Sequence, residues 1–397
     1  MSEYTDKIRT GEVKLYNLEK ELPAHDAVAV RRAYIEEETA ADLAAVASYT
    51  MPEEPAVRRN IENMIGCVQV PLGVAGPLCV KGEYADGSFW IPLATTEGAL
   101  VASINRGCSA LTKAGGAEVR VLSDKMTRAP VFAAESVVHA ADAAAWAKEH
   151  FALLKEAAES TTSHGKLTGF STYTAGTSLY VRFEFETGDA MGMNMATLAS
   201  EAAAKVLAEH TGVRLVAVSG NMCCDKKPSA INIVEGRGKT VSAGIFLSDE
   251  LVRTVFKTEA ALLAEANTRK NLTGSIRAAS FGANAHAANV IAALFIACGQ
   301  DPAHVVEAST CITTADAVEG GVYVSVTLPS LPVGTVGGGT NLSTQAECLA
   351  LLGCIGDGKA RKFAEIAAAA VLAGELSLLG ALAAQHLGKA HKELGRG

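Results

Sequence analysis

The apolar segment FAEIAAAAVLAGELSLLGALAAQHL, residues 363–387, constrains the fold more than any other part of the chain. It is long enough to cross a membrane, but it contains Glu365, Glu375 and Gln385, and carboxylates at membrane depth are costly. A buried helix pair in a globular core fits this composition better. We therefore predict a last long helix over about 359–387, interrupted at Gly388, and no membrane span.

Length and charge narrow the class of protein. A chain of 397 residues suggests about two or three domains. The formal net charge is −8 and no long basic run occurs, which argues against nucleic acid as a partner. The nine cysteines fall mostly in apolar runs, as expected for reduced thiols in a cytoplasmic protein. The CC pair at 223–224 has no C-x2-C partner, so we predict no metal site.

The pattern of hydrophobic residues over 130–218 predicts a separate module. Strands are predicted at about 130–138, 165–171, 177–187 and 213–220, and helices at about 141–160 and 194–212. This gives the order βαββαβ, which is ferredoxin-like. Helices are also predicted for much of 1–50, for 249–266 and for 284–298, and short strands are expected between 61 and 93. The fold class is therefore α+β.

Two glycine-rich stretches could approach a ligand closely. TGDAMGMNMATLASEA, 187–202, reads as a strand, a tight turn and a helix N-terminus, which can face an anion. Its alternating methionines could pad a flat ring, although an ordinary turn from strand to helix explains the pattern as well. VGTVGGGTNL, 333–342, also runs into a helix. Neither stretch is a G-x-G-x-x-G or P-loop motif, so a generic Rossmann dehydrogenase or a nucleotide hydrolase is disfavoured.

Several ionisable residues stand in unusual places. Glu97 in ATTEGAL follows the candidate N-cap residues Thr95 and Thr96 and reads equally as a capping carboxylate or as a buried catalytic acid. Asp301 follows a helix end, where its charge is unfavourable unless a cation lies close; we predict that Lys226 in the run DKK is that cation. His286 and Asn289 lie three residues apart and share one face of a predicted helix. The simpler interpretation is a buried polar pair whose hydrogen bonds are satisfied within the core.

Taken together, these segments resemble the class I 3-hydroxy-3-methylglutaryl-coenzyme A (HMG-CoA) reductases over nearly the whole chain from about residue 60. The matching strings, in order, are ENMIGCVQVPLGVAGPL, TTEGALVASINRG, DAMGMNM, DKKPSAIN, NAHAAN with IACGQD, GTVGGGTNL and LAGELSLLGALAAQHL. The DKKP form distinguishes class I from the bacterial class II enzymes. The chain shows no N-terminal membrane anchor, and in this it resembles the soluble archaeal members.

The resemblance implies the four-electron reduction of HMG-CoA to mevalonate and free coenzyme A, with two NADPH. It implies that Lys226 stabilises the oxyanion, that Asp301 orients Lys226, that Glu97 donates a proton, and that His391 protonates the coenzyme A thiolate. These roles suit the residue types, since an ammonium group can stabilise an oxyanion as it forms and a protonated carboxyl can act as a general acid. On pattern alone, His391 would be dismissed as a solvated residue of the tail.

The resemblance also implies ligand-binding residues. For the substrate these are Arg128, Ser219, Asp225, Lys227, Lys270, His286 and Asn289. For the cofactor they are Asp189, Met191, Gly192, Met193, Asn194, Gly337, Gly338, Gly339 and Thr340. Where relatives have Ser-Arg near the 2′-phosphate of NADPH, this chain has Thr162 and Ser163. NADPH remains the favoured cofactor, with Lys166 as a possible substitute for the arginine, and NADH is an alternative.

The family architecture implies a helical N-terminal domain over 1–65, a large domain from 66–129 and 229–397, an inserted ferredoxin-like domain over 130–218, and a connecting catalytic loop, 219–228. It also implies a homodimer or homotetramer with active sites at the subunit interface. A non-catalytic coenzyme A-binding or regulatory protein that kept the fold is the alternative. The intact set Glu97, Lys226, Asp301 and His391 argues against it.

Overall fold

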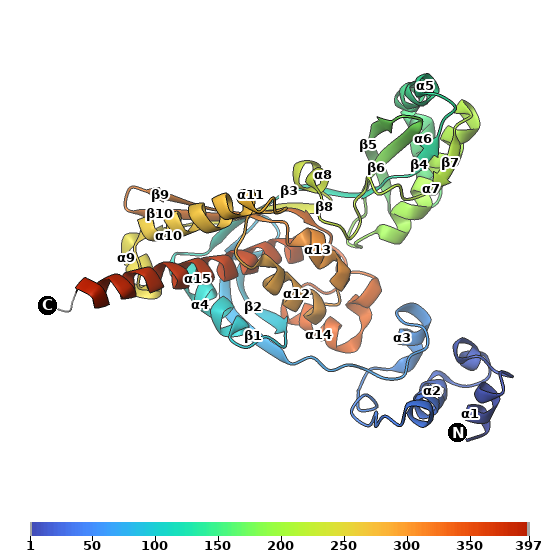
Figure 1. Cartoon of the computed structure of the whole chain (residues 1–397), viewed down its shortest axis with the longest axis horizontal. Coiled ribbons are helices and arrows are strands. Elements are labelled where there is room, and N and C mark those ends of the chain that lie inside the picture. Colours follow the sequence, from blue (N-terminus) through green and yellow to red (C-terminus); the bar gives the residue numbers. More distant parts are fainter. Residues whose placement is uncertain (1, 395–397) are drawn as a thin grey trace.

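The computed structural model describes the backbone of residues 2–394 and the side chains of residues 3–384. Figure 1 shows an elongated molecule with a helical N-terminal lobe, a central body and a small lobe at the end away from the C-terminus. The helices of the N-terminal lobe are α1 (Ser2–Arg9), α2 (Ala24–Thr39) and α3 (Glu53–Arg59). The helix predicted to continue toward residue 49 ends at Thr39, because Ala40 takes a left-handed conformation with φ 56°.

The central body is built on strands β1 (Leu72–Lys81), β2 (Asp86–Ala94), β3 (Ala117–Arg128), β8 (Gly238–Ser248), β9 (Ile312–Val318) and β10 (Gly321–Leu331). They pair in the order β2-β1-β3-β8-β10-β9, antiparallel except for β1 with β3. The main helices packed with this sheet are α4 (Leu100–Lys113), α12 (Ala287–Ala297), α14 (Ser343–Leu351) and α15 (Ala360–Leu394). Together these elements enclose the largest hydrophobic core.

Short elements connect this framework. They are the 3-10 helices Leu15–Lys20, Pro302–His304 and Gly338–Asn341, the π-helices Val252–Phe256 and Asn267–Gly274, and helices α8 (Ala230–Glu235), α9 (Asp249–Leu251), α10 (Ala260–Ala266), α11 (Ser275–Arg277) and α13 (Val305–Ala308). The prediction of one continuous helix over 249–266 was wrong. Lys257 takes a left-handed φ of 56°, which ends the first helical stretch before α10 begins.

The small lobe contains β4 (Val131–Ala133), α5 (Val137–Glu149), α6 (Phe151–Glu159), β5 (Lys166–Ala175), β6 (Ser178–Glu186), α7 (Met193–Thr211) and β7 (Arg214–Ala217). Its antiparallel strands lie in the order β7-β4-β6-β5, and it has its own hydrophobic core. The predicted ferredoxin-like order is confirmed. The first strand is shorter than predicted, and the predicted helix over 141–160 is two helices that meet at His150, where φ is −110° and ψ is 30°.

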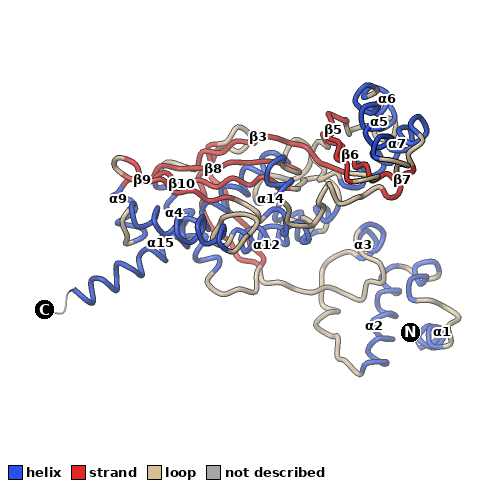
Figure 2. Tube along the Cα trace, turned by 45° about the horizontal axis from the view of Figure 1, so that its top comes forward, coloured by secondary structure: helices blue, strands red, loops and turns tan. Residues whose placement is uncertain are grey.

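Strand β3, for which the sequence suggested no strand, joins the two lobes. Its first part pairs with β8 of the central sheet, and its last residues, Met126–Arg128, pair with β6 of the small lobe. Figure 2 shows the strands continuing from the central body into the small lobe. The chain returns through the loop after β7 to α8 and β8. Arg128 and the loop that contains Lys226 therefore both lie at the junction.

Helix α15 contains the apolar segment that the sequence places in a core. The segment 360–384 is long and apolar enough to span a membrane, but 83% of its most apolar 18-residue stretch is buried inside the fold. The Glu365 carboxylate accepts hydrogen bonds from the backbone N–H groups of Glu83, Tyr84 and Ala85. The Glu375 carboxylate accepts from the N–H groups of Ala285 and His286 and from the Thr313 hydroxyl. These partners explain the two buried carboxylates, because buried charges need such hydrogen bonds.

The predicted helix pair is one continuous helix. Gly374 and Gly380 lie inside it, because each allows another element to pack closely: a Cβ would collide with Val290 at the first position and with Phe256 at the second. The backbone of α15 also continues through Gly388 to Leu394, so the predicted interruption is wrong. The side chains of residues 385–394, including His391, lie outside the described side chains.

Candidate active site

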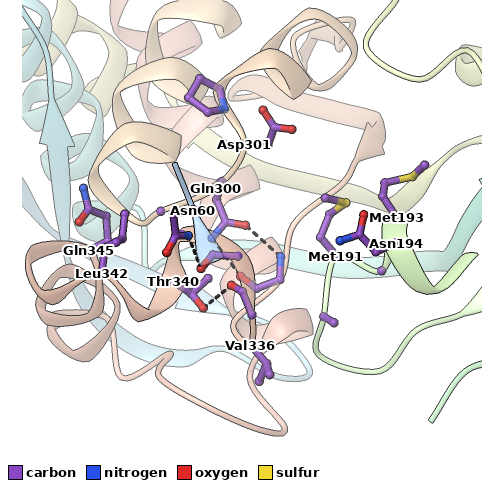
Figure 3. A pocket seen from close by; sticks show the side chains of 18 of the residues that line it. Asn60, Met191, Met193, Asn194, Gln300, Asp301, Val336, Thr340, Leu342 and Gln345 are labelled. Carbon is purple, nitrogen blue, oxygen red and sulfur yellow. Dashed lines mark hydrogen bonds between the residues drawn. The ribbon is translucent and has the colours of Figure 1, made fainter. Parts of the chain in front are cut away.

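A cavity of about 710 Å³ lies where the start of α7 meets the glycine-rich segment before α14. In Figure 3, Met191, Met193 and Asn194 lie on one side of it and Leu342 and Gln345 on the other. Its volume is in the range of small-molecule sites. The predicted cofactor residues that line it are Met191, Gly192, Met193, Asn194, Gly337, Gly338, Gly339 and Thr340.

Backbone contacts hold the two glycine-rich segments together. Ala190 of the first segment and Val336 of the second form a parallel β-bridge. The second segment is also held by the Gln300 side chain, which exchanges two hydrogen bonds of 2.9 Å with the backbone of Gly334. A Cβ on Gly334 would collide with the backbone of Met191. Gly192, with φ 89°, precedes the first turn of α7. The cavity wall therefore offers the free N–H groups of a helix N-terminus, as an anionic ligand requires.

Asp189 is not among the residues that line the cavity. Its carboxylate accepts hydrogen bonds from the N–H groups of Gly358, at 2.6 Å, and Ala360, at 2.9 Å, at the start of α15. Burial raises the pKa of Asp189, but the hydrogen bonds from the N–H groups of Ala360 and Gly358 more than offset this effect. The pKa of Asp189 therefore falls below its usual value. In this structure the predicted cofactor residue Asp189 anchors the cavity rim to α15.

Lys226 and Asp301 form the predicted ion pair. The Lys226 Nζ lies 2.7 Å from the Asp301 Oδ2, and Asp301 also lines the cavity. Asp301 caps the 3-10 helix that follows it, since its Oδ1 accepts from the N–H of Ala303 at 3.0 Å. Burial raises the pKa of Asp301, but the hydrogen bonds from Lys226 and Ala303 more than offset this effect, so the pKa lies below its usual value. The Asp301 carboxylate thus faces the N-terminus of the following helix as well as Lys226. These two contacts offset the unfavourable interaction with the C-terminus of the preceding helix that the sequence suggested.

A buried charge cluster supports this pair, and sequence reasoning missed three of its members. Asp225 contacts Arg237 at 3.0 Å and His304 at 3.0 Å, and it also lies 3.8 Å from Arg128. Glu307 contacts Arg237 at 2.7 Å. The missed residues Arg237, His304 and Glu307 are almost completely buried. The only sequence signal was the spacing of His304 and Glu307, three and six residues after Asp301.

The cations around Asp225 determine its charge. Burial raises the pKa of this carboxyl, but the hydrogen bond from His304 and the charge of Arg237 hold it well below its usual range. Asp225, His304 and Glu307 are close enough together to resemble a metal site. The Arg237 guanidinium already contacts both carboxylates, so the positive charge they need is supplied within the chain.

The comparisons with known proteins identify the family. The protein-family model described as hydroxymethylglutaryl-coenzyme A reductase matches residues 27–396 of this chain. The chain is 55% identical to the 3-hydroxy-3-methylglutaryl-coenzyme A reductase of Methanocaldococcus jannaschii, with 100% of both chains covered. It is 53% identical to that of Methanothermobacter thermautotrophicus, with 99% of each covered.

The chain belongs to the HMG-CoA reductase family.

Solved structures of HMG-CoA reductases have the same fold. A class II enzyme of Streptococcus pneumoniae bound to NADPH matches with a TM-score of 0.69 and 21% identity, covering 88% of this chain and 82% of that one. A second structure of the Streptococcus pneumoniae enzyme matches with a TM-score of 0.69 and 20% identity, covering 96% of both chains.

The position and the exposure of Glu97 differ from those predicted from the sequence. Helix α4 begins at Leu100 after Ala99, whose φ is 68°, so Glu97 lies in the preceding loop and not in the first turn. Thr95 accepts a hydrogen bond from the Glu97 N–H at 3.0 Å but does not cap the helix. The Glu97 side chain is exposed in the single chain and accepts a hydrogen bond from Asn289 at 3.3 Å. The buried setting expected for a catalytic acid is therefore absent from one chain alone.

Three of the other predicted substrate residues lie at the Lys226 loop and three lie elsewhere. Arg128 donates to the Thr197 hydroxyl at 2.9 Å, and the hydroxyl of Ser219 lies 3.5 Å from the thiol of Cys223. His286 contacts the carbonyl of Gly374 at 2.7 Å, so it does not pair with Asn289 as the simpler interpretation proposed. The remaining two are exposed lysines: Lys227, which donates to the Asp225 carbonyl, and Lys270, which lines a separate cavity.

Proposed function

We propose that this chain reduces HMG-CoA to mevalonate and coenzyme A with two NADPH. The observation that carries this proposal is the Lys226–Asp301 pair, because Asp301 also lines the cavity bounded by the two glycine-rich segments. A cation therefore lies next to a cavity large enough for a nicotinamide nucleotide. Family membership at 55% identity to a named reductase supports the same reaction.

The cavity fits NADPH. The first turn of α7 lines it, and the free N–H groups of a helix N-terminus suit a phosphate. Close approach to the backbone is possible at Gly337 and Gly338, since a Cβ there would meet nothing within 4 Å. Met191 and Met193 offer polarisable surfaces to a flat ring. When bound, NADPH supplies the hydride for each reduction.

Lys226 places its ammonium group where the carbonyl oxygen of the thioester gains negative charge, and so stabilises the oxyanion. Asp301 orients that ammonium, since its Oδ2 lies 2.7 Å from the Lys226 Nζ. Glu97 is proposed as the proton donor for the second reduction and His391 as the proton donor to the coenzyme A thiolate. The proposed substrate residues are Arg128, Ser219, Asp225, Lys227, Lys270, His286 and Asn289.

We propose that the working unit is a homo-oligomer with the active site between subunits. The exposed position of Glu97, outside the cavity that Asp301 lines, supports this arrangement. A second subunit could bury Glu97 and bring it to the Lys226 of its partner. We further propose class I membership, from the DKKP sequence at 225–228, a cytoplasmic location, and the domain boundaries 1–65, 66–129 with 229–397, and 130–218.

Cofactor preference is proposed to rest on the segment that leads into β5 and on its first residue, Lys166. Gly165 packs so closely on Met195, a cavity residue, that a Cβ there would collide with its sulfur. This places the segment from Thr162 to Lys166 beside the cavity. Lys166 is exposed and is the proposed partner of the 2′-phosphate, which would favour NADPH over NADH.

Steady-state kinetics with purified protein test the proposal. We expect about two NADPH oxidised for each mevalonate formed, as a four-electron reduction requires. We also expect a higher kcat/KM with NADPH than with NADH, and Lys166→Ala should reduce this ratio. Absence of turnover with both nucleotides would favour the non-catalytic coenzyme A-binding alternative.

A further inference from the structure

His304 lies between the two aspartates that contact the Lys226 region. Its side chain is completely buried. Its Nε2 is 3.0 Å from the Asp225 Oδ1, and its Nδ1 is 4.0 Å from the Asp301 Oδ2. The Nδ1 has no hydrogen-bond partner among the described residues. A buried imidazole nitrogen without a partner is uncommon, and this one faces the carboxylate that holds Lys226.

The charges around His304 balance when its ring is neutral. Asp225, Asp301 and Glu307 face it from three elements, with Glu307 at 3.7 Å from Nε2. The cations paired with these carboxylates are Arg128, Arg237 and Lys226. Three carboxylates and three cations cancel, so one more proton on His304 gives the cluster a net positive charge.

The same cluster holds the backbone at Lys226. This residue takes a left-handed φ of 57°, which is strained for a residue with a Cβ. Its N–H donates to the Glu307 Oε1 at 3.2 Å, and Glu307 is in turn held by Arg237 at 2.7 Å. Arg237 also contacts the sulfur of Met193 at 2.6 Å, in the cavity wall. The cavity, the cluster and Lys226 are therefore in direct contact.

We propose that His304 is a positioning residue that controls the Lys226–Asp301 pair through its protonation state. In the neutral ring, the Nε2–H donates to Asp225 and the Nδ1 lone pair faces Asp301, which leaves that carboxylate to Lys226. A proton on Nδ1 creates an N–H group that faces Asp301 and competes with the ammonium for it. This inference rests on the proposed function, because it assigns the pair a role in hydride transfer to the thioester.

Two variants separate the nitrogens of His304. His304→Gln places an amide nitrogen near the position of Nε2 and keeps a donor for Asp225, whereas His304→Asn places one near Nδ1 and loses that donor. We expect His304→Gln to keep kcat within about threefold at neutral pH and to lose the acid-side decrease in kcat that the N–H group facing Asp301 causes in the wild type. His304→Asn should lower kcat about 10- to 100-fold while the KM for NADPH changes little.

The pH profile distinguishes positioning from simple structural support. If both variants keep the wild-type pH profile of kcat, or lose equal activity with that profile unchanged, the proposal is wrong. Calorimetry on the same samples checks that each variant is folded.

A second measurement needs no turnover. Acetic anhydride labelling of the full-length protein, read by mass spectrometry, compares Lys226 with its neighbour Lys227 as an internal control. Release of Lys226 from Asp301 makes its amine more nucleophilic, so the Lys226 to Lys227 labelling ratio should rise at acid pH in the wild type and stay constant in His304→Gln. A constant wild-type ratio overturns the proposal. Failure of the wild type to reduce HMG-CoA, with the ratio changing as expected, contradicts the proposed function and leaves the coupling of His304 to Lys226 established.

Discussion

Lys226 and Lys227 are adjacent in the chain but have different environments, which predicts different effects of substitution. The Lys226 ammonium is held by Asp301 at 2.7 Å, whereas that of Lys227 contacts only a backbone carbonyl among the described residues. We expect Lys226→Ala to lower kcat about 100- to 1000-fold, as for loss of an oxyanion donor. Lys227→Ala should mainly raise the KM for HMG-CoA. Steady-state kinetics on both variants decides this, and a similar kcat for the two would contradict the assigned roles.

The charge of Asp225 predicts a pH-dependent contribution to stability. Its pKa in the folded chain is below the unfolded value of about 3.9, so its stabilising effect is complete above that value and is lost as the pH falls through the folded pKa. Asp225→Asn should lower the free energy of unfolding by about 2 kcal/mol at neutral pH, because Arg237 loses one of its carboxylates. The difference from the wild type, measured by urea denaturation, should shrink below about pH 4. A difference independent of pH would contradict the ion pairing.

At the scale of elements, α4 and α15 approach each other closely at Gly107. A Cβ at this position would collide with the backbone carbonyl of Ala373, and a backbone group cannot rotate away. We expect Gly107→Ala to lower the free energy of unfolding by about 1–3 kcal/mol. Gly169→Ala in β5 is the control, since its Cβ would meet only the Glu184 carboxylate at 3.7 Å. Equal unfolding midpoints for both variants would contradict close packing of the two helices.

The elements that the sequence predicted well are those with a clear local pattern. The alternation of residues 177–187 predicted β6, and Gly212 marked the end of α7. The Lys226–Asp301 pair was also predictable, because an aspartate after a helix end needs a cation. Strand β3 was missed because most of it pairs with β8 and only its last residues pair with β6, which no local periodicity reveals. Arg237 and Glu307 were missed for a related reason: their burial depends on partners about 70 residues apart in the chain.

At the scale of the whole molecule, the lobes bring the cavity and the Lys226 loop together but leave Glu97 exposed. Among the described residues, the Glu97 carboxylate has its hydrogen bond with Asn289 and makes no contact with the Lys226–Asp301 pair. A symmetric dimer resolves this arrangement if each site combines the Lys226–Asp301 pair of one subunit with Glu97 of the other.

Mixed dimers test this arrangement. Co-expression of Glu97→Gln with Lys226→Ala, each inactive alone, should restore about one quarter of the wild-type activity, because half of the dimers are mixed and each mixed dimer has one intact site of two. Co-expression of Lys226→Ala with Asp301→Asn is the matched control. These two residues pair within one chain, so every mixed site lacks one of them and no activity should return. No recovery in the first mixture would place Glu97 and Lys226 in the same subunit's site and contradict the proposed arrangement.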